Sequence, residues 1–147
     1  MEGSFRVLAG GGQAKTAATL GLALRAVGAG GRVYLARFLR PWGDEEWKGL
    51  VRLNDDVIFR QFGRGGLVDE EPREDDFRAG REAPQEIRRA IRSGDYSLVI
   101  LDEAHVAACF GLFSVEDLVA LLRKSRRRWS WSSPVRAPIL EPSAGRI

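Results

Sequence analysis

The sequence has little of what cross-links a secreted protein or anchors one in a membrane. Its 147 residues include a single cysteine, Cys109, so an internal disulfide is excluded. The apolar neighbours of Cys109 predict a small buried side chain, with a reactive thiol as the alternative. No apolar run approaches the roughly 20 residues of a membrane helix, and the N-terminus lacks the apolar core of a signal peptide. We therefore expect a cytoplasmic protein without a membrane partner.

An excess of charge of one sign is also missing. The formal net charge is only +3, and the charged residues gather in an acidic run at 69–76 and a basic run at 123–128. The acidic run predicts a solvated loop. The basic run favours ordinary surface over contact with nucleic acid or phosphate, because one short cluster is common on protein surfaces. A nucleic-acid partner is not expected.

What remains is the composition of a globular domain. Hydrophobic residues make up 44% of the chain and charged residues 29%, enough for a core of ordinary size. β-Branched and aromatic residues predict four strands, at 6–9, 32–39, 56–62 and 96–102. The first and last of these are continuously apolar over several residues, as expected of central strands in a parallel sheet.

Helical patterns separate the predicted strands. Apolar residues recur with helical spacing over 15–27, and Gly28 is placed to end that helix. Residues 76–92 predict a charged helix that Pro84 kinks or splits. Ser114 and the aspartate three residues later have the spacing of a capping box at the start of another helix. Strands alternating with helices predict a three-layer α/β fold with a mostly parallel sheet.

A glycine-rich segment joins the first strand to the first helix. It nearly spells the phosphate-binding loop Gly-x4-Gly-Lys-Ser/Thr, but Ala9 and Ala14 occupy the two glycine positions and three glycines lie between them. Backbone amides and a helix N-terminus that converge after an apolar strand bind anions. Lys15 would neutralise phosphate charge there, and the Thr16 hydroxyl would ligate Mg²⁺. The alternative is a turn that only connects strand to helix.

An acidic pair stands at the end of the last predicted strand. Asp102 and Glu103 follow four apolar residues, at the carboxyl edge where open α/β sheets bind ligands. Their carboxylates can hold Mg²⁺ directly or through water. Together with the glycine loop, the pair favours a nucleotide site. The letters Asp-Glu-Ala-His also match a helicase box, but the chain lacks a second motor domain, and His105 is interpreted as a turn residue and not a catalytic one.

In combination these motifs resemble the ATP:corrinoid adenosyltransferases of the BtuR/CobA type, over residues 5–124. The family's loop G-D/N-G-K-G-K-T/S and the helix after it are similar to residues 10–34, GGGQAKTAATLGLALRAVGAGGRVY. Its VxQFLKG strand is similar to LARFLRP at 35–41, and its FGRGF segment to residues 62–76. Its YDLVILDE strand, the turn after it and the next helix are similar to residues 93–122.

The resemblance implies a fold and a reaction. The fold is a P-loop NTPase-like, RecA-type nucleotide-binding domain over 1–124, with an atypical C-terminal tail at 125–147. The reaction transfers the 5′-deoxyadenosyl group of ATP to the cobalt of a reduced corrinoid such as cobalamin, and releases triphosphate. Such an enzyme uses Mg²⁺, serves cobalamin biosynthesis or salvage, and is commonly a homodimer.

The resemblance also implies site residues, although it assigns no catalytic side chain. The ATP phosphates would lie against Gly10, Gly11, Gly12, Gln13, Ala14, Lys15, Thr16 and Ala17. The metal would lie at Thr16, Asp102 and Glu103. Leu67 and Val68 fall where the family faces the corrinoid, and neither is aromatic here.

Departures from the family's pattern point to a weakened enzyme. Gln13 replaces a loop lysine, Ala17 replaces a threonine, and Ala14 replaces a glycine. If that glycine has a positive φ, the alanine costs on the order of 1 kcal/mol. The alternatives are another small P-loop ATPase or kinase, and a non-catalytic nucleotide-binding relative.

The C-terminal part departs further. After Lys124 the family continues with an apolar strand ending in TGR, and no such strand is found between Ser125 and Pro134. We hypothesise a local frame disturbance, which the gene's codons 125–136 would reveal. A parallel sheet without this strand would leave backbone groups unpaired at its edge.

Overall fold

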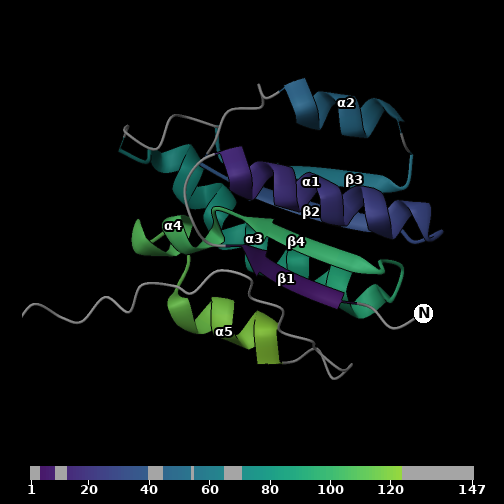
Figure 1. Ribbon diagram of the computed structural model, residues 1–147. Coiled ribbons are helices and arrows are strands. Elements are labelled where there is room, and N and C mark those ends of the chain that lie inside the picture. Colours follow the sequence, from purple (N-terminus) through teal and green to yellow (C-terminus); the bar gives the residue numbers. More distant parts are fainter. Residues whose placement is uncertain (1–3, 9–12, 40–44, 54, 65–70, 124–147) are drawn as a thin grey trace, which may run out of the picture.

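A parallel sheet between two layers of helices forms the protein (Figure 1). The computed structural model describes residues 4–8, 13–39, 45–53, 55–64 and 71–123. The sheet has the strand order β1-β4-β2-β3, and each neighbouring pair is parallel. Its strands are β1 (Ser4–Leu8), β2 (Val33–Phe38), β3 (Val57–Phe62) and β4 (Leu98–Asp102). The three-layer α/β fold with a parallel sheet is therefore confirmed, and each strand lies within two residues of its predicted bounds.

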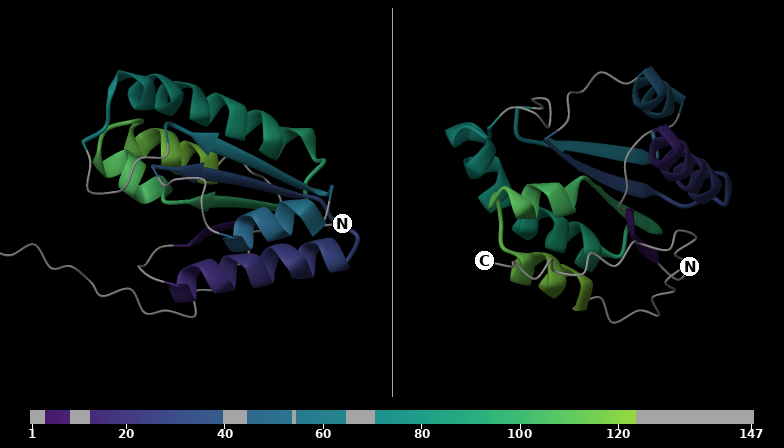
Figure 2. Two further views of the ribbon diagram at one scale, coloured as in Figure 1. Left: turned by 90° about the horizontal axis from the view of Figure 1, so that it is seen from above. Right: turned by 60° about the vertical axis from the view of Figure 1, so that its left-hand side comes forward.

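Five helices are found in the described residues. They are α1 (Gln13–Gly28), α2 (Glu45–Leu53), α3 (Glu74–Ser93), α4 (Ala104–Cys109) and α5 (Val115–Arg123). Figure 2 shows α1 and α2 on one side of the sheet, and α3, α4 and α5 on the other. None of these helices has the length and apolar character needed to cross a bilayer.

The layer under α1 and α2 is purely aliphatic at its centre. Buried side chains of β2, β3 and β4 meet Ala23 of α1 and Leu50 of α2. The strand residues of this face are Val33, Leu35, Val57, Leu98 and Ile100. Alternate residues of a strand point to opposite faces, so one face of each strand packs here and the other packs against α3 to α5.

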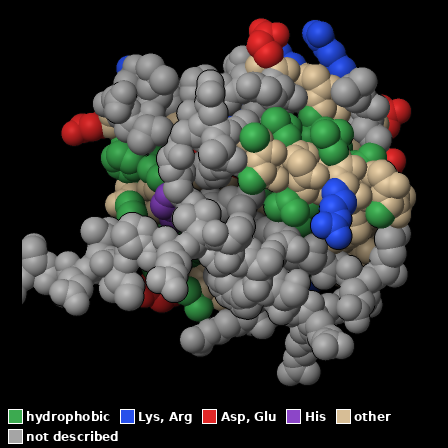
Figure 3. All heavy atoms as spheres, viewed as in Figure 1, with side chains coloured by type: hydrophobic (Ala, Val, Ile, Leu, Met, Phe, Trp, Pro, Cys, Tyr) green, Lys and Arg blue, Asp and Glu red, His purple; other side chains and the backbone are tan. Residues whose placement is uncertain are grey.

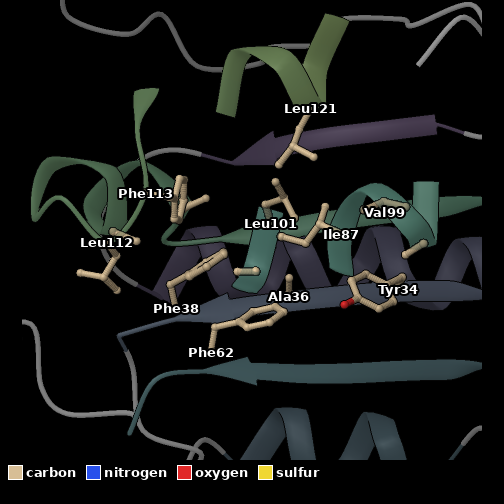
Figure 4. Packing of buried hydrophobic residues seen from close by; sticks show 14 of the residues in the cluster. Tyr34, Ala36, Phe38, Phe62, Ile87, Val99, Leu101, Leu112, Phe113 and Leu121 are labelled. Carbon is tan, nitrogen blue, oxygen red and sulfur yellow. The ribbon is translucent and has the colours of Figure 1, made fainter. Parts of the chain in front are cut away.

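The opposite layer is larger and carries the aromatic residues (Figure 4). Phe38 of β2 stacks on Phe62 of β3, with ring centroids 5.3 Å apart, and lies 5.2 Å from the ring of Phe113. Ile87 of α3 and Leu121 of α5 complete this core. Full burial of such side chains contributes roughly 1.5–3 kcal/mol each, so this face holds α3 and α5 against the sheet.

The predicted end of the first helix is confirmed. α1 ends at Gly28, and the chain turns at Gly30, which has φ +76°. The amides of Gly30 and Gly31 donate to the carbonyls of Val27 and Ala26, at 2.8 and 3.0 Å, and so close the last turn. A positive φ is easy for glycine alone, so Gly30 lets the chain turn directly after the helix.

Pro84 does not split the predicted helix at 76–92. Residues 74–93 form one helix with Pro84 inside it, and Pro84 is buried. Its neighbours on the buried face include Gly80, Ala83 and Ile87. Packing of this face against the sheet offsets the backbone hydrogen bond that a proline removes.

The start of α5 is confirmed. The amide of Asp117 donates to Ser114 Oγ at 3.0 Å, and that hydroxyl donates to Asp117 Oδ2 at 2.8 Å. The sequence patterns did not predict the short helices α2 and α4. Residues 125–147, the predicted atypical tail, lie outside the described residues.

Candidate functional site

The ends of β1 and β4 lie side by side at the carboxyl edge of the sheet. The two strands pair in parallel, and Leu8 is the register partner of Asp102. Helix α1 begins at Gln13, so the connection between β1 and α1 starts beside Asp102. Both sequence motifs therefore meet at one edge. Gly10, Gly11 and Gly12 fall in this connection, outside the described residues.

The first turn of α1 carries the remaining predicted phosphate-binding residues. Gln13, Ala14, Lys15 and Thr16 have helical backbone, and the side chain of Ala17 is exposed. Figure 1 shows this end of α1 on the same side as the arrowheads of the strands. The helix N-terminus thus faces the ligand-binding edge, where its backbone dipoles favour an anion.

Backbone strain at Ala14 was expected only if this position had a positive φ, and Ala14 has a helical backbone. A residue inside α1 has a negative φ, and alanine is the most favourable residue in a helix. The replacement of a glycine by Ala14 therefore costs nothing in backbone conformation. Of the two adjacent replacements, only Gln13 changes the chemistry of the first turn, because it removes a positive charge.

At the carboxyl edge the layer under α1 and α2 changes from apolar to polar. Leu98, Val33 and Val57 are in register across β4, β2 and β3. Four residues further along the strands, the aligned positions are Asp102, Arg37 and Gln61. Positions in register share a face of a parallel sheet, so the three polar residues lie on the α1 and α2 side.

Arg37 and Asp102 form a buried ion pair within this row. Arg37 Nε lies 3.1 Å from Asp102 Oδ2, and the side chains are 0% and 4% exposed. Sequence reasoning missed Arg37. A charged residue within the buried strand β2, just before its last residue, is itself a signal, because arginine is almost never fully buried unless it is paired.

Glu103 lies next to this pair with an unusual backbone. It is buried and has φ +60° and ψ +16°, directly before α4. Its carbonyl accepts a hydrogen bond from the amide of Ala107 at 3.0 Å. Leu39, which follows the neighbouring strand β2, has φ +53°. Among the described residues these are the two non-glycine positions with positive φ, and such strain concentrates at functional sites.

The described residues fit a magnesium ion only in part. They contain no group of three or more His, Cys, Asp and Glu side chains close enough to hold a metal. Asp102 and Glu103 bring two carboxylates to the edge, but the guanidinium of Arg37 neutralises the first. A third oxygen would have to come from Thr16, whose side chain is not described, or from the phosphates.

Asp76 is the centre of a second polar cluster, which joins Arg64, just after β3, to Arg73, just before α3. The Asp76 carboxylate accepts hydrogen bonds from the amides of Arg64 and Arg73, at 2.7 and 2.9 Å. It also accepts two from the guanidinium of Arg64, at 3.2 Å from Nε and 2.8 Å from Nη2. Burial raises the pKa of Asp76, but these hydrogen bonds and the charge of Arg64 outweigh burial and leave the pKa below its ordinary value.

This cluster corrects the interpretation of the acidic run. Residues 74–76 form the first turn of α3, and Asp76 is 3% exposed and not part of a solvated loop. The carboxylate joins the two ends of segment 65–72, which contains the predicted corrinoid-facing residues. Leu67 and Val68 themselves lie outside the described residues.

Two further predictions at α4 are wrong. His105 is a helical residue, near the start of α4, and does not lie in a connecting turn as predicted. Its Nδ1 is buried without a hydrogen-bond partner in the described part of the chain. Cys109 is exposed, because the buried positions of α4 are Ala104 and Ala107 and the last residue of the helix faces outward.

Comparison with known proteins settles the relationship. Residues 1–131 match the family model of ATP:corrinoid adenosyltransferases BtuR/CobO/CobP. This chain belongs to that family. It is 31% identical over 124 residues to the corrinoid adenosyltransferase of Escherichia coli strain K12, which covers 84% of this chain and 62% of the relative.

A second relative is more distant. The chain is 25% identical over 122 residues to the corrinoid adenosyltransferase of Pseudomonas aeruginosa strain PAO1, which covers 81% of this chain and 59% of the relative. The chain thus spans less than two thirds of the length of these relatives. The resemblance inferred from the sequence is confirmed at the level of the family.

Proposed function

We propose that this adenosyltransferase-family chain transfers the 5′-deoxyadenosyl group of ATP to the cobalt of a reduced corrinoid and releases triphosphate. One observation carries the proposal: the connection from β1 to α1 starts beside Asp102, with Glu103 next to it at the same edge. In the reaction an electron pair on cobalt forms the bond to the 5′ carbon. The bond from that carbon to oxygen breaks, and its electron pair leaves with triphosphate.

The residues of this chain have three tasks. Those from Gly10 to Ala17 hold the triphosphate through backbone amides, the N-terminus of α1 and the charge of Lys15. Thr16, Asp102 and Glu103 hold Mg²⁺, which neutralises charge on the leaving group when it is bound. Leu67 and Val68 face the corrinoid. Because Gln13 lacks the positive charge of the family's lysine, we expect weaker ATP binding than in relatives that have it.

The setting that we propose follows the family. The protein is cytoplasmic, acts on ATP and a corrinoid, and forms a homodimer. It has neither a membrane nor a nucleic acid as a partner.

The test is a reaction with ATP, Mg²⁺ and a chemically reduced corrinoid. We expect a cobalt–carbon product in the absorption spectrum and intact triphosphate among the products. Formation of ADP and phosphate would indicate an ATPase or kinase instead. Failure to bind nucleotide or form product would identify a non-catalytic relative.

Lys15→Ala is the decisive variant for the loop. We expect ATP affinity to fall by at least about a hundredfold, because a charged group that faces phosphates has no neutral substitute. Lys48→Ala, on α2, is the matched control and should bind ATP as the wild type does. Nucleotide titration by calorimetry measures both. Equal affinity in Lys15→Ala and wild type would remove the phosphate-binding assignment.

A further inference from the structure

The only histidine and the only cysteine of the chain lie four residues apart on one helix. Both belong to α4, which spans Ala104–Cys109. Side chains at positions i and i+4 of a helix are neighbours, with Cβ atoms about 5–6 Å apart, and the side chain at i+4 points back toward the one at i. The imidazole of His105 and the thiol of Cys109 therefore lie side by side on one face of α4.

Backbone hydrogen bonds hold this short helix at both ends. At its start, the amide of Ala107 donates to the carbonyl of Glu103 at 3.0 Å. At its end, the amide of Leu112 donates to the carbonyl of Ala107 at 3.0 Å, and Gly111 has φ +74°, the left-handed conformation that often follows a helix. The spacing between the histidine and the cysteine is therefore fixed by the fold and not only by their order in the sequence.

The surroundings of the two side chains suit the binding of a ligand. Cys109 is exposed. His105 is half-buried, and its Nδ1 is buried without a hydrogen-bond partner in the described part of the chain. A buried polar atom without a partner is rare in native structures and calls for an explanation. A cation shared between the ring and the thiol supplies such a partner.

The donor atoms select the kind of cation. Thiolate sulfur and imidazole nitrogen are the ligands that zinc prefers, whereas Mg²⁺ and Ca²⁺ prefer oxygen. Zinc bonds of about 2.3 Å to sulfur and about 2.1 Å to nitrogen fit between side chains with Cβ atoms about 5–6 Å apart. The described ranges of the chain contain no group of three or more His, Cys, Asp and Glu side chains that could hold a metal. Water therefore completes the coordination of a two-residue site.

We propose that His105 and Cys109 form a binding site for a thiophilic divalent cation such as Zn²⁺. The site differs from the magnesium position proposed at Thr16, Asp102 and Glu103, because its ligands are nitrogen and sulfur and not oxygen. It does not depend on the proposed function. The bound cation joins the first and the last turn of α4 and thereby stabilises this helix.

The experiment titrates the full chain, freed of metal by chelation and dialysis and kept reduced, with Zn²⁺ by calorimetry and with Co²⁺ by absorption. Co²⁺ bound to a thiolate gives a sulfur-to-metal charge-transfer band, which identifies the cysteine as a ligand. Loss of a residue that only supports a metal ligand lowers affinity by roughly 10–100-fold. We therefore expect Cys109→Ser and His105→Asn each to bind Zn²⁺ at least about tenfold more weakly than wild type.

The double variant Cys109→Ala/Phe110→Cys is the matched control. It keeps one histidine and one exposed thiol, because Phe110 is 38% exposed, but it places them five residues apart, outside the neighbouring positions of a helix. We expect it to bind Zn²⁺ as weakly as Cys109→Ser does. Wild-type affinity in this variant would mean that any exposed thiol suffices, and would overturn the inference.

Thermal unfolding gives a second readout. Zn²⁺ should raise the unfolding temperature of wild type and not that of Cys109→Ser, because a cation that binds the folded state stabilises it. Cys109 is exposed, so Cys109→Ser tests the site even if His105→Asn does not fold. Equal Zn²⁺ affinity in wild type and Cys109→Ser, or no charge-transfer band when Co²⁺ is added to wild type, overturns the inference.

Discussion

At the scale of single residues, Asp76 joins more parts of the chain than any other carboxylate whose contacts are described above. Its two oxygens accept hydrogen bonds from the backbone on both sides of segment 65–72 and from the guanidinium of Arg64. Hydrogen bonds to an ionised, buried group contribute more than neutral ones, roughly 1.5–3 kcal/mol each. Asp76 therefore stabilises the start of α3 and the segment before it together.

We expect Asp76→Asn to lower the free energy of unfolding at pH 7 by about 3 kcal/mol, because the amide cannot accept the same set of hydrogen bonds. Urea unfolding followed by circular dichroism measures this change. The control is Asp75→Asn, which breaks an exposed pair with Arg78 and should cost less than about 0.5 kcal/mol. Equal effects at the two positions would contradict the importance of the buried cluster.

The same residue gives a pH dependence with a definite sign. The pKa of Asp76 is lower in the folded protein than its ordinary value of 3.8. Its contribution is therefore fully present above that ordinary value and is lost as the pH falls toward and through the folded pKa. Wild type should lose stability over this acidic range more steeply than Asp76→Asn, and parallel pH profiles of the two proteins would argue against the assignment.

The sequence predicted the place of a functional residue where that place depends on neighbouring residues in the chain. It did not predict contacts between residues that are far apart in sequence. The adjacent acids Asp102 and Glu103 could be placed at a strand end, and the structure has them there. The ion pair of Asp102 with Arg37 joins residues 65 positions apart, so no local pattern contains it. The exposure of Cys109 was mispredicted for a related reason, since apolar neighbours in sequence do not say which side of a short helix faces outward.

At the scale of elements, α3 approaches the turn after α4 at Gly80. A Cβ atom added at Gly80 would lie 2.6 Å from both the Cβ and the carbonyl oxygen of Leu112. Distances this short require a shift of backbone as well as side chain. The absence of a side chain therefore sets how closely α3 packs against this turn, which leads from α4 to α5.

We expect Gly80→Ala to destabilise the protein by about 1–3 kcal/mol, although alanine is the better helix former. Gly49→Ala in α2 is the matched control, because a Cβ atom there meets nothing within 4 Å. It should stabilise by about 0.5–1 kcal/mol. Thermal unfolding of the two variants checks both signs, and stabilisation by Gly80→Ala would mean that the turn can move away at little cost.

Elements were predictable where the pattern that forms them is long and regular. The four strands and α1 follow from continuous apolar runs and helical spacing, and α5 from its capping serine. Of the two alternatives for α3, the split at Pro84 is wrong, because burial of Pro84 depends on the sheet against which α3 packs and not on local sequence. The helices α2 and α4 have nine and six residues, too short for their spacing to stand out from the surrounding chain.

At the scale of the whole molecule, the order of the strands assembles the candidate site. Residues near 8, 37 and 102 are far apart in sequence, and the order β1-β4-β2 makes them neighbours at one edge. Figure 3 shows the molecule from the side of α1, where hydrophobic side chains gather over the helix with few charged ones between them. Among the residues of α1, Leu24 is 52% exposed.

The strand order also predicts which backbone amides of the sheet exchange fastest with solvent. β4 and β2 each pair on both sides, whereas β1 pairs with β4 alone among the described residues and β3 with β2 alone. In a strand at an edge, every second amide points away from its neighbour and depends on solvent. We therefore expect these amides of β1 to exchange with deuterium on the order of a hundredfold faster than the amides of β4, as NMR or mass spectrometry measures.

The edge strand β3 provides the internal reference for this measurement, since its alternate amides should exchange as fast as those of β1. The result bears on the C-terminal departure from the family, because a strand after Lys124 would have to pair with an open edge of the sheet. Protection of every β1 amide to the level of β4 would show that another segment covers β1, and that the predicted loss of a strand is wrong. Fast exchange confined to alternate β1 amides would mean that the sheet ends at β1, so that the β1-to-α1 connection lies at the boundary of the sheet.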